Sequence, residues 1–182
     1  MSYRRYAYGA PFYVAAGWCP VPARERFPPG PRGPVPDVDQ ISRWAAGPEG
    51  DWNLCVRLPD HVVGIDVDCY RSTRDCAAVI AEWEGRLGAL PATSYSTARV
   101  DGSKVLVFRV PAGRSFVDDL DGSVSVLHPS TSRCWYVTCW PTIHARTGWP
   151  YFWHNVGGPA GPPAVESLAA LPEPWVTALT KV

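Results

Sequence analysis

The stretch that most constrains the fold is residues 62–68, Val-Val-Gly-Ile-Asp-Val-Asp. An apolar run of this length is typical of a buried strand, and here two carboxylates stand at its end. Side chains alternate across a strand, so we expect Asp66 and Asp68 on one face, close enough to share a cation. Adjacent carboxylates repel each other, and a divalent metal neutralises that repulsion. The alternative is that the two carboxylates satisfy a turn or cap the following helix.

The chemistry of this pair points to particular metals. Hard oxygen ligands suit Mg²⁺ or Mn²⁺, and these cations usually act on phosphates. The pattern therefore predicts phosphate chemistry that depends on a divalent metal and is centred on Asp66 and Asp68.

Composition limits the remaining classes. A chain of 182 residues that is 46% hydrophobic and has nine Trp is expected to fold as a globule. Its formal net charge is zero, so no overall basic field indicates nucleic acid. The six Cys include no C-x-x-C pair, which argues against a zinc finger or redox motif. We see neither a signal peptide nor an apolar run of 18 residues, so we expect a cytoplasmic protein without a membrane partner.

The pattern along the chain predicts an α+β domain with a mostly antiparallel sheet and flanking helices. We expect one short helix capped by Asp37, and a second helix with Ser72 as its N-cap that ends at Gly88. The turn at Pro59 and Asp60 predicts a hairpin between the strands on either side of it. The predicted strands are residues 52–58, 62–68, 93–97, 104–110, 123–127, 136–140 and 149–153.

Five ordered blocks carry a family resemblance. They are GWCPVP (17–22), ISRW (41–44), NLCVRLPD (53–60) with GIDVD (64–68), STARVDGS (96–103) with FRVP (108–111), and YVTCWPTIH (136–144) with TGWPYFW (147–153). Together they resemble the bifunctional DNA primase/polymerase N-terminal domain of the archaeo-eukaryotic primase superfamily, in the form carried by actinobacteria and their phages. This resemblance spans roughly residues 6–153.

The resemblance implies an enzyme that joins nucleotides on a DNA template in bacterial or phage replication. The template and (deoxy)nucleoside triphosphates would be its partners, with Mg²⁺ or Mn²⁺ as cofactor and a replicative helicase in a separate chain. On this interpretation residues 1–156 form the primase/polymerase-like domain, and residues 157–182 form a Gly/Pro linker and a C-terminal helical segment. Asp66 and Asp68 would be the catalytic metal ligands. The predicted contacts to nucleotide or DNA are Arg99, Ser103, Lys104, Arg109 and His144. For His144 the alternative is a structural role in the turn that contains it.

The third metal ligand is less clear. The family places an acid on the strand that here reads Ser-Val-Ser-Val-Leu-His at 123–128. The apolar alternation puts Ser125 at the acidic position, whereas an ungapped count back from Trp140 reaches His128. His128 is the candidate we include in the metal set, since imidazole is a ligand for Mn²⁺. Asp119 and Asp121 lie just upstream and are further candidates.

Two other functions compete with the polymerase. The same domain with a degraded site could bind nucleotide or nucleic acid as a replication accessory without polymerising. A small phosphohydrolase using the Asp pair is a third hypothesis, although no residue outside the pair supports it.

Overall fold

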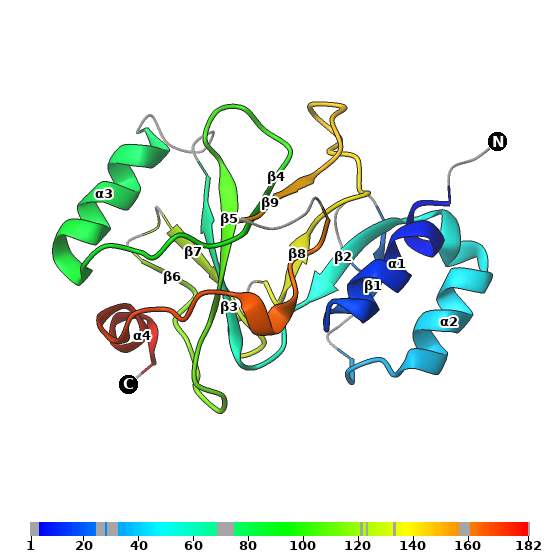
Figure 1. Ribbon diagram of the computed structural model, residues 1–182, viewed down its shortest axis with the longest axis horizontal. Helices are drawn as coiled ribbons and strands as arrows, with labels where there is room; N and C mark the ends of the chain where they lie inside the picture. The colour runs from blue at the N-terminus through cyan, green and yellow to red at the C-terminus, as the bar shows by residue number, and fades with distance from the viewer. Residues whose placement is uncertain are drawn as a thin grey trace.

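The protein is described by a computed structural model, drawn in Figure 1. The structure describes residues 4–24, 28, 33–68, 75–120, 122, 124–132, 134–156 and 161–181. Two predicted features, the N-cap at Ser72 and the candidate ligand Asp121, lie outside these residues.

A six-stranded antiparallel sheet forms the centre of the molecule, with β3 (Val62–Val67) in an inner position. β3 pairs with β5 along its whole length and with β7 on its other side. The remaining strands extend the sheet in the order β6-β7-β3-β5-β4-β9. Their bounds are β4 (Tyr95–Thr97), β5 (Lys104–Arg109), β6 (Asp119–Leu120), β7 (Val124–Leu127) and β9 (Phe152–His154).

The two faces of this sheet have different surroundings, because side chains alternate along each strand. Val63, Ile65 and Val67 of β3 point into a core with α3 (Cys76–Leu87) and α4 (Glu173–Leu179), and all three are buried. Figure 1 shows these two helices on the same side of the molecule. The alternate residues, Val62 and Asp66 among them, therefore face the other way.

The second sheet has three strands in the order β1-β2-β8, all antiparallel. They are β1 (Cys19–Ala23), β2 (Asn53–Arg57) and β8 (Tyr136–Thr138). α1 (Arg5–Ala15), α2 (Val38–Ala46) and the 3-10 helix η1 (Pro48–Asp51) lie beside it, at the opposite end of the molecule from α3. A second core joins the two sheets, because Leu54 and Val56 of β2 share it with Val107 and Leu127 of the large sheet.

The predicted α+β class with mostly antiparallel strands is confirmed. The predicted hairpin between residues 52–58 and 62–68 is wrong, since β2 and β3 belong to different sheets. β2 pairs with β1 and β8, and β3 pairs with β5 and β7. The chain at Pro59 and Asp60 therefore connects one sheet to the other. The second predicted helix begins at Cys76, where the Asp75 side chain accepts a hydrogen bond from the Ala77 amide.

Helix α1 was not predicted, because it contains Gly9 and Pro11, which are poor helix formers. The packing explains the glycine. A Cβ at position 9 would lie 2.7 Å from Cδ of Pro141, so only glycine lets the helix approach this closely. Tertiary packing therefore overrides the local propensity in this segment.

The C-terminal segment is part of the core. After the 3-10 helix η3 (Val165–Ser167), the backbone amide of Arg109 donates to the Ala169 carbonyl and the Leu171 amide donates to the Arg109 carbonyl. Trp175 of α4 is completely buried and its Nε1 donates to the Gly88 carbonyl at 2.8 Å. The helix predicted in residues 157–182 is therefore present and helps to cover the large sheet.

Cysteines and hydropathy bear on the expected environment. Cys55 and Cys139 are buried thiols outside any disulfide, whereas Cys76 is disulfide-bonded, which a strictly reducing environment does not predict. Within the described part of the chain, every helix is too short or too polar to cross a bilayer.

We expect Trp175→Ala to lower the free energy of unfolding by about 3–5 kcal/mol, because it leaves a large cavity in the core under the six-stranded sheet. Thr177→Ala, an exposed change on the same helix, is the control and should stay within about 0.5 kcal/mol of the native protein. Urea unfolding followed by circular dichroism measures both. Equal, small effects would mean that α4 is not part of the cooperative fold.

Candidate active site

A pocket with a volume of about 270 Å³ lies between the two sheets. Residues of β3, β4, β5 and β7 form one side of it, and residues of β8 form the other. His144 and Tyr151, from the segment between β8 and β9, complete the lining. The pocket is therefore built by both sheets together.

Asp66 and Asp68 both line this pocket, and both are half-buried. Asp66 is opposite Ser125 of β7 and opposite Val105 of β5, and Val105 is in turn opposite Ser96 of β4. Residues paired across antiparallel strands project to the same face. This row of side chains from four strands therefore forms the floor of the pocket, with Asp66 inside it.

Gly64 keeps the floor next to Asp66 closely packed. A Cβ on Gly64 would lie 3.1 Å from Cβ of Leu127 and 3.2 Å from Cγ1 of Val105. The neighbouring strands thus fill the space that a side chain would need. The glycine of the Gly-Ile-Asp-Val-Asp run has a packing role beside the acidic pair.

The two strand residues paired with Asp66, Val105 and Ser125, bring no further carboxylate to the pocket as a third metal ligand. Ser125 occupies the position opposite Asp66, as the alternation predicted, and it brings a hydroxyl group. Asp119 is opposite Ser125 on β6, two strands from Asp66, so its backbone is roughly 10 Å away. Its Oδ1 accepts a hydrogen bond from the Gly122 amide at 3.0 Å. Among the residues that the structure describes, no cluster of three His, Cys, Asp or Glu residues is arranged to hold a metal.

The placement of His128 argues against the predicted metal ligand. The residue follows β7, is 1% exposed and does not line the pocket. Its Nδ1 lies 3.0 Å from the Ser130 amide, which donates to it, and its Nε2 lies 2.9 Å from the Asp60 carbonyl. The ring also packs edge-on against Phe116. Both ring nitrogens therefore contact neighbouring loops, and His128 lies outside the pocket that contains Asp66 and Asp68.

Arg99 reaches the pocket from the loop between β4 and β5, where Asp101 holds it. The Arg99 Nε donates to Asp101 Oδ2 at 2.8 Å, and its Nη2 donates to the same oxygen. Asp101 Oδ1 accepts from the Ser103 amide at 3.0 Å. The hydrogen bond from Arg99 is the main reason why the pKa of Asp101 falls to about 2. The pair therefore stays ionised at every pH above about 2.

Ser103 and Lys104 also line the pocket, next to Arg99. Ser103 is buried, and its carbonyl accepts a hydrogen bond from the Thr97 hydroxyl at 2.6 Å. The Lys104 Nζ lies 5.2 Å from the centroid of the Tyr95 ring, within range of a cation–π interaction. Three of the predicted contact residues thus converge with the two carboxylates.

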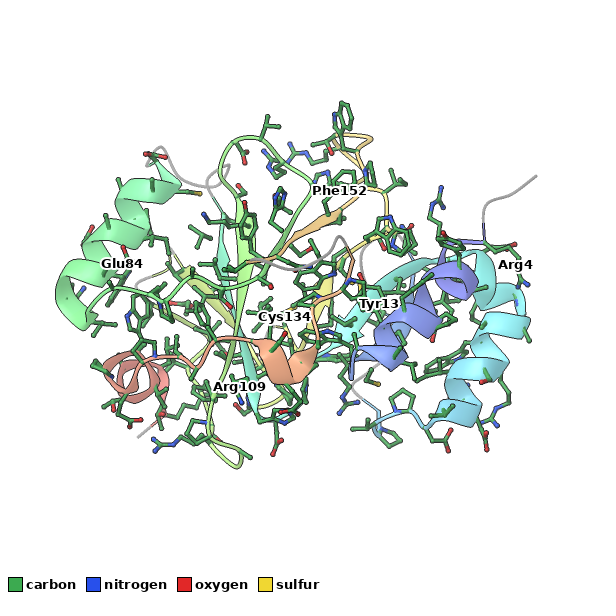
Figure 2. All side chains as sticks on the ribbon, in the orientation of Figure 1. Arg4, Tyr13, Glu84, Arg109, Cys134 and Phe152 are labelled. Atoms are coloured by element: carbon green, nitrogen blue, oxygen red, sulfur yellow. The ribbon has the colours of Figure 1, made fainter. Side chains whose placement is uncertain are left out.

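Arg109 does not join them. It pairs with Val62, at the other end of β5 from Lys104, and its Nε donates to the Leu168 carbonyl at 2.9 Å. Figure 2 shows its side chain next to the C-terminal segment. This placement argues against the predicted nucleotide contact and indicates that Arg109 holds the C-terminal segment against the sheet.

His144 lines the pocket and is 8% exposed. Its Nδ1 accepts hydrogen bonds from the backbone amides of Arg146 at 3.3 Å and Thr147 at 3.1 Å. An accepting Nδ1 leaves the proton of the neutral ring on Nε2. The sequence left open a turn role or a ligand role, and the geometry combines a turn contact with a place in the pocket.

Several pocket residues were not predicted as site residues, among them Cys134, Tyr136 and Thr138. The period-2 pattern of β8 places Tyr136 and Thr138 on one face, which was the available signal. The thiol of Cys134, which lies in the centre of Figure 2, interacts electrostatically with the Asp66 carboxylate. Burial is the main cause that raises the pKa of this thiol to about 11, and Asp66 raises it as well, so the thiol is neutral at pH 7.

The donor set suits a hard cation. Two carboxylates and the Ser125 hydroxyl offer oxygen atoms on adjacent strands, and the nearby thiol is protonated. Mg²⁺ needs only one or two carboxylates when waters and phosphates complete its shell. The arrangement is therefore chemically consistent with a metal shared between the protein and a phosphate ligand.

Comparison with known proteins agrees with this geometry. The family model for the bifunctional DNA primase/polymerase, N-terminal domain matches residues 10–174, which is most of the chain. A search of curated proteins and a search of solved structures returned no significant match.

Asp101→Asn should weaken binding of a nucleoside triphosphate about two- to fivefold, because it releases the guanidinium that the ion pair positions at the pocket. Asp51→Asn is the control, since Asp51 holds Arg4 in a similar but more exposed pair outside the pocket. Calorimetric titration with nucleotide and Mg²⁺ measures both variants. Tighter binding by Asp101→Asn would mean that Asp101 competes with phosphate for Arg99.

Proposed function

The chain belongs to the bifunctional DNA primase/polymerase N-terminal family, and on that premise we propose that it is a nucleotidyltransferase that joins nucleotides on a DNA template. The single observation that carries the proposal is the convergence of Asp66 and Asp68 with Arg99, Ser103 and Lys104 in one pocket. Carboxylates and cationic groups side by side are what a metal–triphosphate complex requires.

In this proposal Asp66 and Asp68 hold the divalent cation, Mg²⁺ or Mn²⁺. When bound, such a cation lowers the pKa of an attacking hydroxyl and neutralises charge on the phosphates. Ser125, directly opposite Asp66, is the nearest protein oxygen for a further contact.

The phosphates are held by the loop between β4 and β5. Arg99 supplies a guanidinium that Asp101 orients through its Nε and Nη2, and Lys104 adds a point charge from the start of β5. His144 contributes an Nε2–H donor, because its Nδ1 accepts from the turn. Ser103 keeps the loop closed through its backbone contacts to Asp101 and Thr97.

The proposed setting is bacterial or phage DNA replication, with a DNA template and (deoxy)nucleoside triphosphates as partners and a replicative helicase in a separate chain. A second candidate function is a replication accessory that binds nucleotide or DNA without polymerising. The position of Ser125 favours it, because a hydroxyl stands opposite Asp66 where the family resemblance implies an acid. Primer extension separates the two candidates.

Asp66→Asn should abolish primer extension in Mg²⁺ and in Mn²⁺ while the thermal midpoint is unchanged or raised, since it removes a metal ligand and relieves carboxylate repulsion. Asp75→Asn, at an exposed helix cap on the same chain segment, is the control for loss of an acidic residue. Turnover retained in Asp66→Asn would refute the metal assignment. Absence of extension in the native chain, with nucleotide still bound, would favour the accessory function.

Ser125→Glu should increase Mn²⁺ affinity by about tenfold or more, because it adds an anionic oxygen directly across from Asp66. If the native site is a weakened polymerase, primer extension should rise as well. Ser42→Glu, on the exposed face of α2, controls for the added charge. Metal titration followed by electron paramagnetic resonance of free Mn²⁺ gives the affinity, and no change in Ser125→Glu would place the cation elsewhere.

A further inference from the structure

A second groove lies outside the pocket, on the side of the small sheet that faces away from the large one. Its volume is about 340 Å³, and three partly exposed tryptophans line it: Trp44, Trp52 and Trp135. Pro22, Pro34 and Pro36 also line this groove. Large aromatic surfaces gathered in one groove need a partner with flat or apolar faces to exclude water.

Cations accompany two of these rings. The guanidinium carbon of Arg24 lies 4.6 Å from the Trp52 ring centroid, and that of Arg57 lies 5.3 Å from the Trp135 centroid. Arg57 also donates to the carbonyls of Gly33 and Pro34 at 2.6 and 3.1 Å, so it fixes one wall of the groove. Among the described lining residues, Glu49 is the one acidic residue and Arg57 the one arginine, while Arg24 lies beside the groove over Trp52.

The groove and the active-site pocket are lined by consecutive residues of one short segment. Cys134 and Tyr136 line the pocket, and Trp135 between them lines the groove. Trp135 and Tyr136 pack edge to face at 5.3 Å between centroids, and Tyr136 is opposite Arg57 across the sheet. A strand of nucleic acid leaving the pocket over Tyr136 therefore reaches Trp135 next.

We propose that this groove binds the unpaired stretch of the DNA template, with bases stacked on Trp52 and Trp135 and a backbone phosphate at Arg24. The inference rests on the proposed function, which requires single-stranded template beside the nucleotide. Aromatic stacking accepts any base, and arginine fits phosphate, so this combination suits a single strand read without sequence preference. The formal net charge of the chain is zero, so DNA binding is expected to depend on local cations such as Arg24.

The test uses the full chain and fluorescein-labelled oligo-dT of about 20 nucleotides, with binding followed by fluorescence anisotropy at one fixed salt concentration. Trp52→Leu and Trp135→Leu should each weaken binding about tenfold or more, since each removes one stacking surface but stays apolar. Trp149→Leu is the matched control, because Trp149 is 65% exposed outside the groove, and it should change binding less than about twofold. Circular dichroism confirms that each variant is folded.

Arginine variants test the phosphate contact. Arg24→Ala should weaken oligo-dT binding and lower its salt dependence. Arg86→Ala is the control, because Arg86 forms the same kind of cation–π pair with Trp83 on α3 and should leave binding unchanged.

Three outcomes would refute the proposal that the groove binds DNA. The first is no oligo-dT binding by the native chain, and the second is unchanged binding in both groove tryptophan variants. The third is a proline-rich decapeptide that binds the native chain but not Trp52→Leu, while Trp52→Leu still binds oligo-dT. Failure of the proposed function looks different. In that case the native chain and Asp66→Asn bind oligo-dT equally through the tryptophans, and neither extends a primer.

Discussion

The structure depends on the pairing of β3 with two neighbours at once. Because β3 lies between β5 and β7, its backbone is hydrogen-bonded on both sides and its alternate side chains must find two different environments. Val63, Ile65 and Val67 are buried against α3 and α4. Because side chains alternate along the strand, Asp66 must project from the opposite face of the sheet. A slip of one residue would place a carboxylate in the apolar core. The same burial that stabilises the fold therefore fixes the orientation of Asp66.

The pocket lies where the apolar core shared by the two sheets ends along β3. Below Asp66, Val62, Leu127 and Val107 share a core with β2 and α1. Next to this core, a polar contact joins the sheets: the Ser96 hydroxyl of β4 donates to the Thr138 carbonyl of β8 at 2.9 Å. Both residues also line the pocket between the two sheets. The space between them is where a charged ligand can be accommodated.

The sequence allowed β3, the α+β class and the acidic pair to be predicted, because these follow from local alternation. It did not allow the split of β2 and β3 into two sheets, since a turn at Pro59 and Asp60 is compatible with either pairing. Arg109 and His128 were predicted as site residues from residue type and position in a motif. Their contacts to the Leu168 carbonyl and to Ser130 and Asp60 depend on chain segments that are distant in sequence or on loop geometry, which no local pattern contains.

The charge balance of the pocket links the two proposed ligands. In formal charges, Asp66 and Asp68 contribute two negative charges to the pocket lining and Lys104 contributes one positive charge. Arg99 is already paired with Asp101, so its charge is largely offset, and the Cys134 thiol is neutral. Over the described residues the formal sum is one negative charge, which opposes a bare triphosphate. A divalent cation between the carboxylates reverses that sign, and by linkage a bound triphosphate must then tighten the cation to the same extent. On the proposed assignment of Asp66 and Asp68 as the acidic ligands, the phosphates would complete the metal site, so we expect cation and nucleotide to bind as a unit.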